Sequence, residues 1–300
     1  MGQRVFVTGA TGVLGRRVVP RLIQAGHHVT AAVRSQAKAE GAQAAGATPV
    51  RVDVFDRAAM RAAIDGHDSI AQLATHIPYG PSAARRSAWR TNDRLRREAA
   101  PAIAAAAVDA GVGRYIQESI TFPYVDGGER WIDEDHDRVY YWGNECTVAA
   151  EAAAAGFTSA GGVGIVLRFS LFMAPDSAHT QGFIAAARRG VFAVVGPADG
   201  YISFVHVDDA AASVVAALGA PAGTYNVAEP DPVRRSAHRA ALTTVVGRSR
   251  VRAVPGLVER AGGAAADSLA RSHRISSSRL SDVTKWKPTI RCIEHWGDLA

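Results

Sequence analysis

The 300-residue sequence predicts an α/β fold built on a doubly wound parallel sheet, with a smaller C-terminal lobe that holds the substrate. In the first half, short β-branched runs alternate with alanine-rich stretches, which is the pattern of successive strand–helix–strand units. After residue 170 the rhythm changes to short, irregular elements interrupted by prolines. We therefore expect a sheet domain at 1–170 with a returning segment at 201–228, and a lobe formed by 171–200 and 229–300.

The elements follow from local pattern. Arg4–Thr8 is an apolar strand, and Leu14–Ala25 is a helix that ends at Gly26. A long helix is predicted over Trp89–Ala110, with Pro101 as its kink or break. The remaining predicted elements are the strand His28–Val33, a helix running to Gly46, the strand Pro49–Val52, the helix Ala58–Ile64, the strands Ser69–Ala74 and Arg114–Glu118, the helix Glu145–Ala155, and the strands Gly164–Phe169, Phe192–Val195 and Tyr201–Val205.

Composition argues against several classes of function. The net charge is +6, but the basic residues are scattered, which favours a solvated surface over a nucleic-acid-binding stripe. Cys146 and Cys292 are far apart in the sequence, which excludes a disulfide framework and a thiolate metal site and fits a reducing cytoplasm. No apolar run approaches the ~18 residues that span a membrane, and the N-terminus has no signal-peptide layout. We expect a cytoplasmic monomer or homodimer without a metal, nucleic-acid or membrane partner.

The strongest motif is the run T-G-A-T-G-V-L-G at residues 8–15, which joins the first predicted strand to the first predicted helix. Its first glycine permits a sharp turn, its second lets the backbone approach a diphosphate, and its third lets the helix pack close to the sheet. Exposed amides and the positive helix end then hold the phosphates. The motif predicts a Rossmann-type dinucleotide site formed by Gly9, Thr11, Gly12, Val13, Leu14 and Gly15.

The end of the second strand bears on which dinucleotide is bound. An acidic residue there would bind an unphosphorylated ribose, but this chain has Arg34, with Lys38 one turn later. A guanidinium matches a 2′-phosphate, so the sequence favours NADP, with NAD and a plain surface arginine as the alternatives. Asp53 follows the third strand, where its side chain can accept a hydrogen bond from adenine, whereas Asp56 equally suits a helix cap.

These residues and several later ones resemble the extended and atypical short-chain dehydrogenase/reductase superfamily, the NAD-dependent epimerase/dehydratase group. The resemblance covers nearly the whole chain. It implies that Val54, Leu73, Ala74 and Thr75 line the adenosine and ribose, and that Asn92 stands at the family's asparagine. Its further landmarks are Gly111–Ile116, Val166–Phe169, Phe204–Ala210 and Gly223–Val227.

The resemblance also implies a Ser or Thr after the fifth strand and a Y-x-x-x-K pair on the next helix. The tyrosine exchanges a proton with the substrate, and the lysine lowers the pKa of that tyrosine and holds the ribose. Here the pair is missing, because no lysine occurs between Lys38 and Lys285. Aligning Glu151 with the family's glutamate places Gly143 and Thr147 at the two positions. The remaining candidate catalytic hydroxyls are those of Ser119, Thr121 and Tyr141.

We therefore expect an NADP-dependent oxidoreductase or epimerase-type enzyme that acts on the carbonyl or alcohol of a small or medium organic substrate. The alternatives are a redox-silent dinucleotide sensor or regulator, and a non-redox cyclase or isomerase that uses the same cleft. The loop at 121–143 is rich in acids and aromatics, so an acid–base role is open for Glu118, Asp126, Glu134 or His136, against a solvated acidic loop.

Two further motifs are interpreted as structural. His206 with Asp208 and Asp209 predicts a helix entry capped by Asp208. Arg168, in the sixth predicted strand, is expected to stabilise the fold or border the cofactor.

Overall fold

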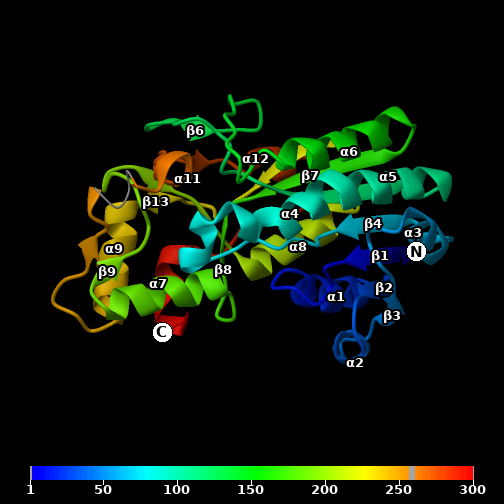
Figure 1. Cartoon of the computed structure of the whole chain (residues 1–300), viewed down its shortest axis with the longest axis horizontal. Coiled ribbons are helices and arrows are strands. Elements are labelled where there is room, and N and C mark those ends of the chain that lie inside the picture. The colour runs from blue at the N-terminus through cyan, green and yellow to red at the C-terminus, as the bar shows by residue number, and fades with distance from the viewer. Residues whose placement is uncertain (1, 257–260, 300) are drawn as a thin grey trace.

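A computed structural model describes residues 2–256 and 261–299 and shows a layered sheet domain beside a smaller lobe (Figure 1). The central sheet has seven strands in the order β12-β7-β5-β4-β1-β2-β3, and each neighbouring pair is parallel. The strands are β1 (Arg4–Thr8), β2 (His28–Val33), β3 (Thr48–Arg51), β4 (Ser69–Gln72), β5 (Arg114–Ile120), β7 (Val163–Phe169) and β12 (Gly223–Val227). The chain winds outward from β1 in both directions, as the sequence predicts.

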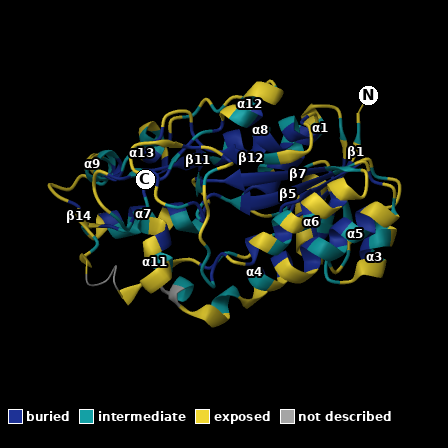
Figure 2. Cartoon of the chain, turned by 90° about the horizontal axis from the view of Figure 1, so that it is seen from above, coloured by how far each residue is buried: buried dark blue, intermediate teal, exposed yellow. Residues whose placement is uncertain are grey.

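Helices cover both faces of the sheet (Figure 2). One layer holds α1 (Gly15–Gln24), α2 (Gln36–Ala44) and α8 (Val207–Ala217), and the other holds α3 (Arg57–Ile64), α5 (Ala100–Asp109) and α6 (Thr147–Ser159). In β1, Val5 and Val7 pack toward α1 and Phe6 packs toward α3. All three side chains are fully buried, because a parallel sheet with helices on both faces has no solvated side.

The long helix predicted over Trp89–Ala110 is interrupted before its proline. It consists of α4 (Arg90–Arg94), a π-helical turn at Leu95–Ala99, and α5. Pro101 lies in the first turn of α5, where its missing N–H is tolerated. The expected irregularity therefore falls in the π turn. Arg96 lies in this turn, on the same face as the buried Asn92 and Ala99, and is only 2% exposed.

The C-terminal lobe is built from α7 (Ala178–Arg188), α9 (Arg235–Val245) and α13 (Trp296–Leu299) around Phe192, Phe204 and Leu242. The strand predicted at Phe192–Val195 is limited to Val191–Phe192, and the strand predicted at Tyr201–Val205 is divided at Ser203 into Tyr201–Ile202 and Phe204–His206. Each piece pairs in a two-stranded ladder. The ladders are β8 (Leu171–Met173) with β11 (Phe204–His206), β10 (Tyr201–Ile202) with β13 (Val233–Arg234), β9 (Val191–Phe192) with β14 (Arg252–Ala253), and β6 (Trp131–Ile132) with β15 (Arg274–Ile275). The lobe also carries α11 (Gly263–Ala270), whereas α12 (Ser278–Val283) packs against β12 and places Leu280 in the core beneath α1 and α8.

The start of α8 corrects one sequence prediction. The cap is His206, whose ring nitrogen accepts a hydrogen bond from the backbone N–H of Asp208 at 3.3 Å. Asp208 instead pairs with Arg21 of α1 at 2.8 Å, which joins the two helices of this layer. Within the described ranges, no helix combines the length and apolar character needed to cross a membrane.

Candidate active site

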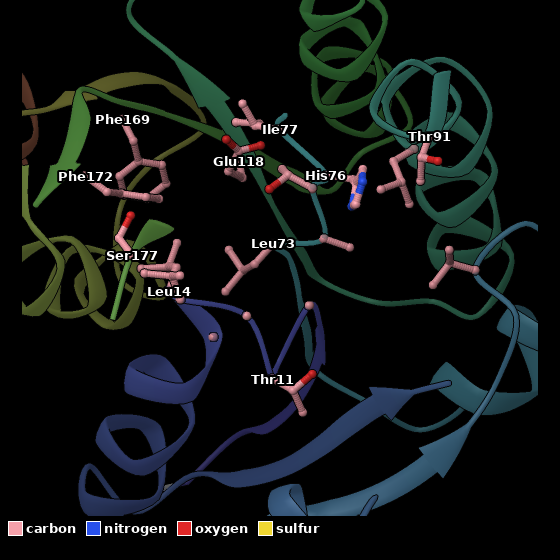
Figure 3. Close-up of a pocket in the computed structure, with 18 of the residues that line it drawn as sticks. Thr11, Leu14, Leu73, His76, Ile77, Thr91, Glu118, Phe169, Phe172 and Ser177 are labelled. Atoms are coloured by element: carbon pink, nitrogen blue, oxygen red, sulfur yellow. The ribbon is translucent and has the colours of Figure 1, made fainter. Parts of the chain in front are cut away.

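A cavity of about 510 Å³ lies at the carboxyl edge of the sheet, where ligands bind in open α/β folds (Figure 3). Its wall is made by the turn after β1, the ends of β2 and β3, the segments that follow β4, β5 and β7, and the start of α7. β4 ends two residues earlier than predicted, at Gln72, so that the next residues leave the sheet and line the cavity. The predicted cofactor residues in the wall are Gly9, Thr11, Gly12, Val13, Leu14, Gly15, Arg34, Asp53, Val54, Leu73, Ala74 and Thr75.

The glycine turn fits a diphosphate. Gly9 has a φ of 66°, and a Cβ there would lie 2.7 Å from the backbone of Leu73 and Ala74, so only glycine allows this close approach. Within the described chain, the amides of Val13 and Leu14 donate to no acceptor, and the first turn of α1 carries no acidic residue. Free amides at a positive helix end are the donors that bind phosphate oxygens.

The adenosine end of the cavity combines positive charge with an aromatic face. Arg34 and Lys38 line it, both are exposed, and neither has an ion-pair partner among the described residues. Asp53 accepts a hydrogen bond from the N–H of Phe55 at 3.0 Å through one oxygen, which leaves its other oxygen for a ligand. Phe55 also lines the cavity, with the Arg94 guanidinium 4.1 Å from its ring centroid. These groups offer an aromatic face, a free carboxylate oxygen and two cations to a ligand at this end.

Asp56 and Asn92 have supporting positions. Asp56 caps α3 by accepting from the N–H of Ala59 at 3.0 Å. Asn92 is buried outside the cavity wall, and its side-chain oxygen accepts from the N–H of His76 at 3.2 Å. Because His76 lines the cavity, Asn92 braces the segment after β4 from behind.

The three candidate hydroxyls do not line the cavity. Ser119 is fully buried and donates to an oxygen of Glu151 at 2.7 Å. Thr121 is also buried, with its hydroxyl oxygen 3.4 Å from that of Ser170. Tyr141 is half-buried, and burial raises the pKa of its hydroxyl to about 12. The structure therefore brings the predicted cofactor residues together but places these hydroxyls outside the cavity wall.

A buried polar network lies behind β5 and β7. Glu151 of α6 accepts from Arg168 at 2.9 and 2.7 Å and from Arg138 at 2.8 Å. Burial disfavours the charge of Glu151, but Arg168, Ser119 and Arg138 together outweigh it and hold its pKa below the usual range. Arg168 also donates to the hydroxyl of Tyr124 at 2.7 Å. Arg168 thus ties α6, β7 and the loop after β5 together.

Glu118 is a buried ionisable side chain for which the sequence leaves an acid–base role open. It lines the cavity, is only 4% exposed, and both its oxygens accept from the same nitrogen of Arg96, at 3.0 and 2.8 Å. Burial raises its pKa to about 7, against the opposing effect of Arg96. Its partner Arg96 lies between the exposed Arg94 and Arg97, and nothing in the local sequence marks it as the buried arginine of the three.

Comparison with known families identifies the chain. The model of a family described as NAD(P)H-binding matches residues 9–158, which is half of the sequence. The chain belongs to this NAD(P)H-binding family. Its cavity, with the glycine turn at one wall, lies where Rossmann-type folds bind a dinucleotide.

Individual proteins agree with this membership. A "3-diazoavenalumate denitrifying reductase" of a Streptomyces species is 28% identical to this NAD(P)H-binding protein, over 96% of each chain. A "4-hydroxy-2-methyl-3-oxo-4-farnesyl-3,4-dihydroquinoline-1-oxide ketoreductase" of Stigmatella aurantiaca is 31% identical over 45% of this chain and 39% of its own.

Solved structures share the fold. A UDP-glucuronic acid 4-epimerase from Bacillus cereus, in complex with UDP-glucuronic acid and NAD, superimposes with a TM-score of 0.76 at 15% identity, covering 99% of this chain and 98% of that one. A UDP-N-acetylglucosamine 4-epimerase from the same species superimposes with a TM-score of 0.75 at 17% identity, covering 99% of this chain and 95% of that one. The predicted α/β fold is confirmed, and the family match makes this chain an NAD(P)H-binding protein.

Proposed function

We propose that this enzyme is an NADPH-dependent reductase that acts on an activated small organic electrophile. The observation that carries the proposal is a complete dinucleotide cavity without the tyrosine–lysine pair. No lysine occurs between Lys38 and Lys285, so no lysine can lower the pKa of a tyrosine beside the cofactor. An unassisted tyrosine hydroxyl, with a pKa near ~10, is a poor base at neutral pH.

The missing base affects the two directions of hydride transfer unequally. Oxidising an alcohol, as in sugar epimerisation, requires a group that removes the hydroxyl proton, and losing such help costs about 10²–10⁴-fold in rate. Reducing an electron-poor substrate requires no base. The names of the relatives support this direction: one reductase acts on a diazo compound and the other on a ketone.

The preference for NADPH over NADH is part of the proposal. It is supported by the unpaired cations Arg34 and Lys38 at the adenosine end, where an unphosphorylated ribose would call for an acidic residue. When bound, the reduced nicotinamide supplies a hydride to the substrate. The chain's own part is to hold the diphosphate on the glycine turn and to line the far end with apolar side chains such as Phe169 and Phe172.

We also propose where the protein is located in the cell and which part of the chain holds the substrate. Both cysteines, Cys146 and Cys292, are free and buried, which suits a reducing cytoplasm. Residues 171–200 and 229–300 form the substrate lobe, supported by the contribution of Phe172, Ser177 and His179 to the cavity wall.

Calorimetry with NADPH and NADH, followed by NADPH-consumption assays, tests the proposal. We expect NADPH to bind at least about tenfold more tightly, since hydrogen bonds to a charged group contribute about 1.5–3 kcal/mol. Failure to bind either cofactor would sink the proposal, and equal affinity would remove only the preference. Tight binding without turnover supports a sensor, and product formed without cofactor consumption supports a cyclase or isomerase.

A further inference from the structure

The end of the cavity away from Arg34 is lined by several large apolar side chains and one buried carboxylate. In the sheet, β5 and β7 lie on the opposite side of β1 from β2 and β3, so the segments after them border the nicotinamide half of a bound dinucleotide. Ile77, Phe169 and Phe172 line this end together with Glu118 (Figure 3). Ile120 also belongs to the wall. The carboxylate is thus placed where substrate and nicotinamide must meet.

The pairing of Glu118 leaves it free to interact with a ligand. A single nitrogen of Arg96 donates to both its oxygens, and no other described side chain or amide donates to them. Arg96 itself retains two buried nitrogens, Nε and Nη1, that have no partner in the described chain. An ion pair buried this deeply is costly unless it is fully hydrogen-bonded, so the pair is weak evidence for stability and better evidence for function.

We propose that Glu118 is the acid–base residue of this site, that it takes over the proton transfer which a tyrosine–lysine pair performs in related enzymes, and that Arg96 is its positioning residue. This inference rests on the proposed reductase function. It assigns the substrate to compounds with a polarised C=O or C=N bond whose heteroatom must receive a proton.

The transfer balances as follows. The reduced nicotinamide supplies a hydride to the substrate carbon, and the π electron pair of the C=O or C=N bond becomes a lone pair on the heteroatom. Glu118 gives the proton of its Oε–H group to that atom, so one O–H bond breaks and a new O–H or N–H bond forms. The resulting carboxylate stays paired with Arg96 and regains a proton from water after the product leaves.

The surroundings of Glu118 keep both of its protonation states within reach. Burial is the largest influence and raises the pKa of this carboxyl to about 7, while Arg96 lowers it and the nearby Glu151 of α6 raises it. The other titratable side chains of the adjacent wall are His76, Tyr79 and His179. A general acid is most effective when its pKa lies near the working pH.

The variant E118Q tests the proposal with two electrophiles. Reduction of 9,10-phenanthrenequinone consumes a hydride and a proton, whereas reduction of 4-methoxybenzenediazonium to anisole and N₂ consumes a hydride alone. We expect kcat for the quinone to fall about 10²–10⁴-fold, and kcat for the diazonium salt to fall by a much smaller factor, because only the quinone reaction consumes a proton. The matched control is E229Q, because Glu229 is equally buried, its pKa is also raised to about 7, and it lies outside this cavity.

A second measurement requires no turnover. The fluorescence of bound NADPH is followed against pH, and we expect a transition near pH ~7 in the wild type and in E229Q that is absent in E118Q. In R96M the transition moves to higher pH, because the cation that favours the carboxylate is gone; a purely structural role for Arg96 would leave it in place.

The outcomes separate this inference from the proposed function. Full quinone activity in E118Q, equal loss of both probe activities, or a wild-type complex whose fluorescence does not titrate overturns the role of Glu118. So does loss of quinone activity in S119A, T121V or Y141F while E118Q remains active. Wild-type enzyme that does not bind NADPH overturns the proposed function itself.

Discussion

The two ends of the cavity differ in how the sequence specifies them. The adenosine end is formed by short stretches directly after β1, β2 and β3, and Gly9, Arg34 and Asp53 can each be assigned from local pattern. The nicotinamide end collects side chains from segments that are distant in the sequence, such as Glu118 on β5 and Phe172 after β7. A phosphate site made of backbone amides can therefore be predicted from a local motif. The positions of the reacting side chains depend on tertiary packing, which a local motif does not specify.

The largest effect is expected at the nicotinamide end, from the ion pair behind it. Arg168→Met leaves the carboxylate of Glu151 buried, with only the half-exposed Arg138 as a cationic partner, so we expect unfolding free energy to fall by about 3–5 kcal/mol. Urea denaturation measures the loss.

The double variant E151Q/R168M is the control for this pair, because it removes both charges and so leaves no buried carboxylate without its Arg168 partner. We expect it to recover a large part of the stability. A double variant as unstable as R168M would show that Arg168 acts through packing, not through its charge.

A somewhat smaller effect is expected at the glycine turn. Gly9→Ala must place a Cβ 2.7 Å from the backbone of Leu73 and Ala74 at a φ of 66°, which combines strain with overpacking. We expect a loss of about 2–5 kcal/mol in unfolding free energy, and weaker NADPH binding by calorimetry. Gly26→Ala is the matched control, since φ is 85° there but no atom lies within 4 Å of its Cβ. Equal losses in both variants would rule out the close approach as the cause.

The fold is predictable because its determinants are local and repeated. The alternation of strands and helices, the glycine turn and the family landmarks lead to the observed sheet order and to a cavity lined by nearly all the predicted cofactor residues.

Other features of the site could not be predicted, for identifiable reasons. The π turn at Leu95–Ala99 has no sequence signature beyond a proline downstream. At the start of α8, His206 is the cap and Asp208 pairs with Arg21, 187 positions away. Ser119 lies on the side of β5 that contacts Glu151, and Glu118 lies on the side that lines the cavity. Successive side chains of a strand point to opposite faces, so an error of one residue in the alignment of β5 exchanges the two roles.

Cofactor selectivity provides a test confined to the adenosine end. Arg34→Ala should weaken NADPH binding about 10- to 100-fold and leave NADH binding unchanged, because the guanidinium interacts only with the added phosphate. Calorimetry with both cofactors measures this. Arg61→Ala is the control, since Arg61 pairs with Asp65 on α3 and lies outside the cavity wall. A parallel loss for NADH would mean that Arg34 supports the turn and not the phosphate.

The smallest effect concerns the lobe that covers the nicotinamide end. Burial, reinforced by Arg235, lowers the pKa of His238 from 6.5 to about 3, and its ring nitrogen accepts from the Trp296 indole at 3.1 Å, so the residue is neutral when folded. On unfolding it regains its ordinary pKa and takes up a proton. Its contribution to stability is therefore complete above pH 6.5 and is lost as the pH falls toward 3.

Between about pH 7 and about pH 5.5 this histidine should account for a loss of about 1 kcal/mol. His238→Asn keeps an acceptor for Trp296 but cannot titrate. Urea denaturation at the two pH values should therefore show that the variant loses about 1 kcal/mol less unfolding free energy than the wild type. If the unfolding free energy of the variant depends on pH as steeply as that of the wild type, other groups are responsible for the acid sensitivity of the lobe. The next residue to replace would be His273, because burial lowers its pKa to about 4. In either case the adenosine end, held by backbone amides that do not titrate, should keep its affinity for the diphosphate over the same range.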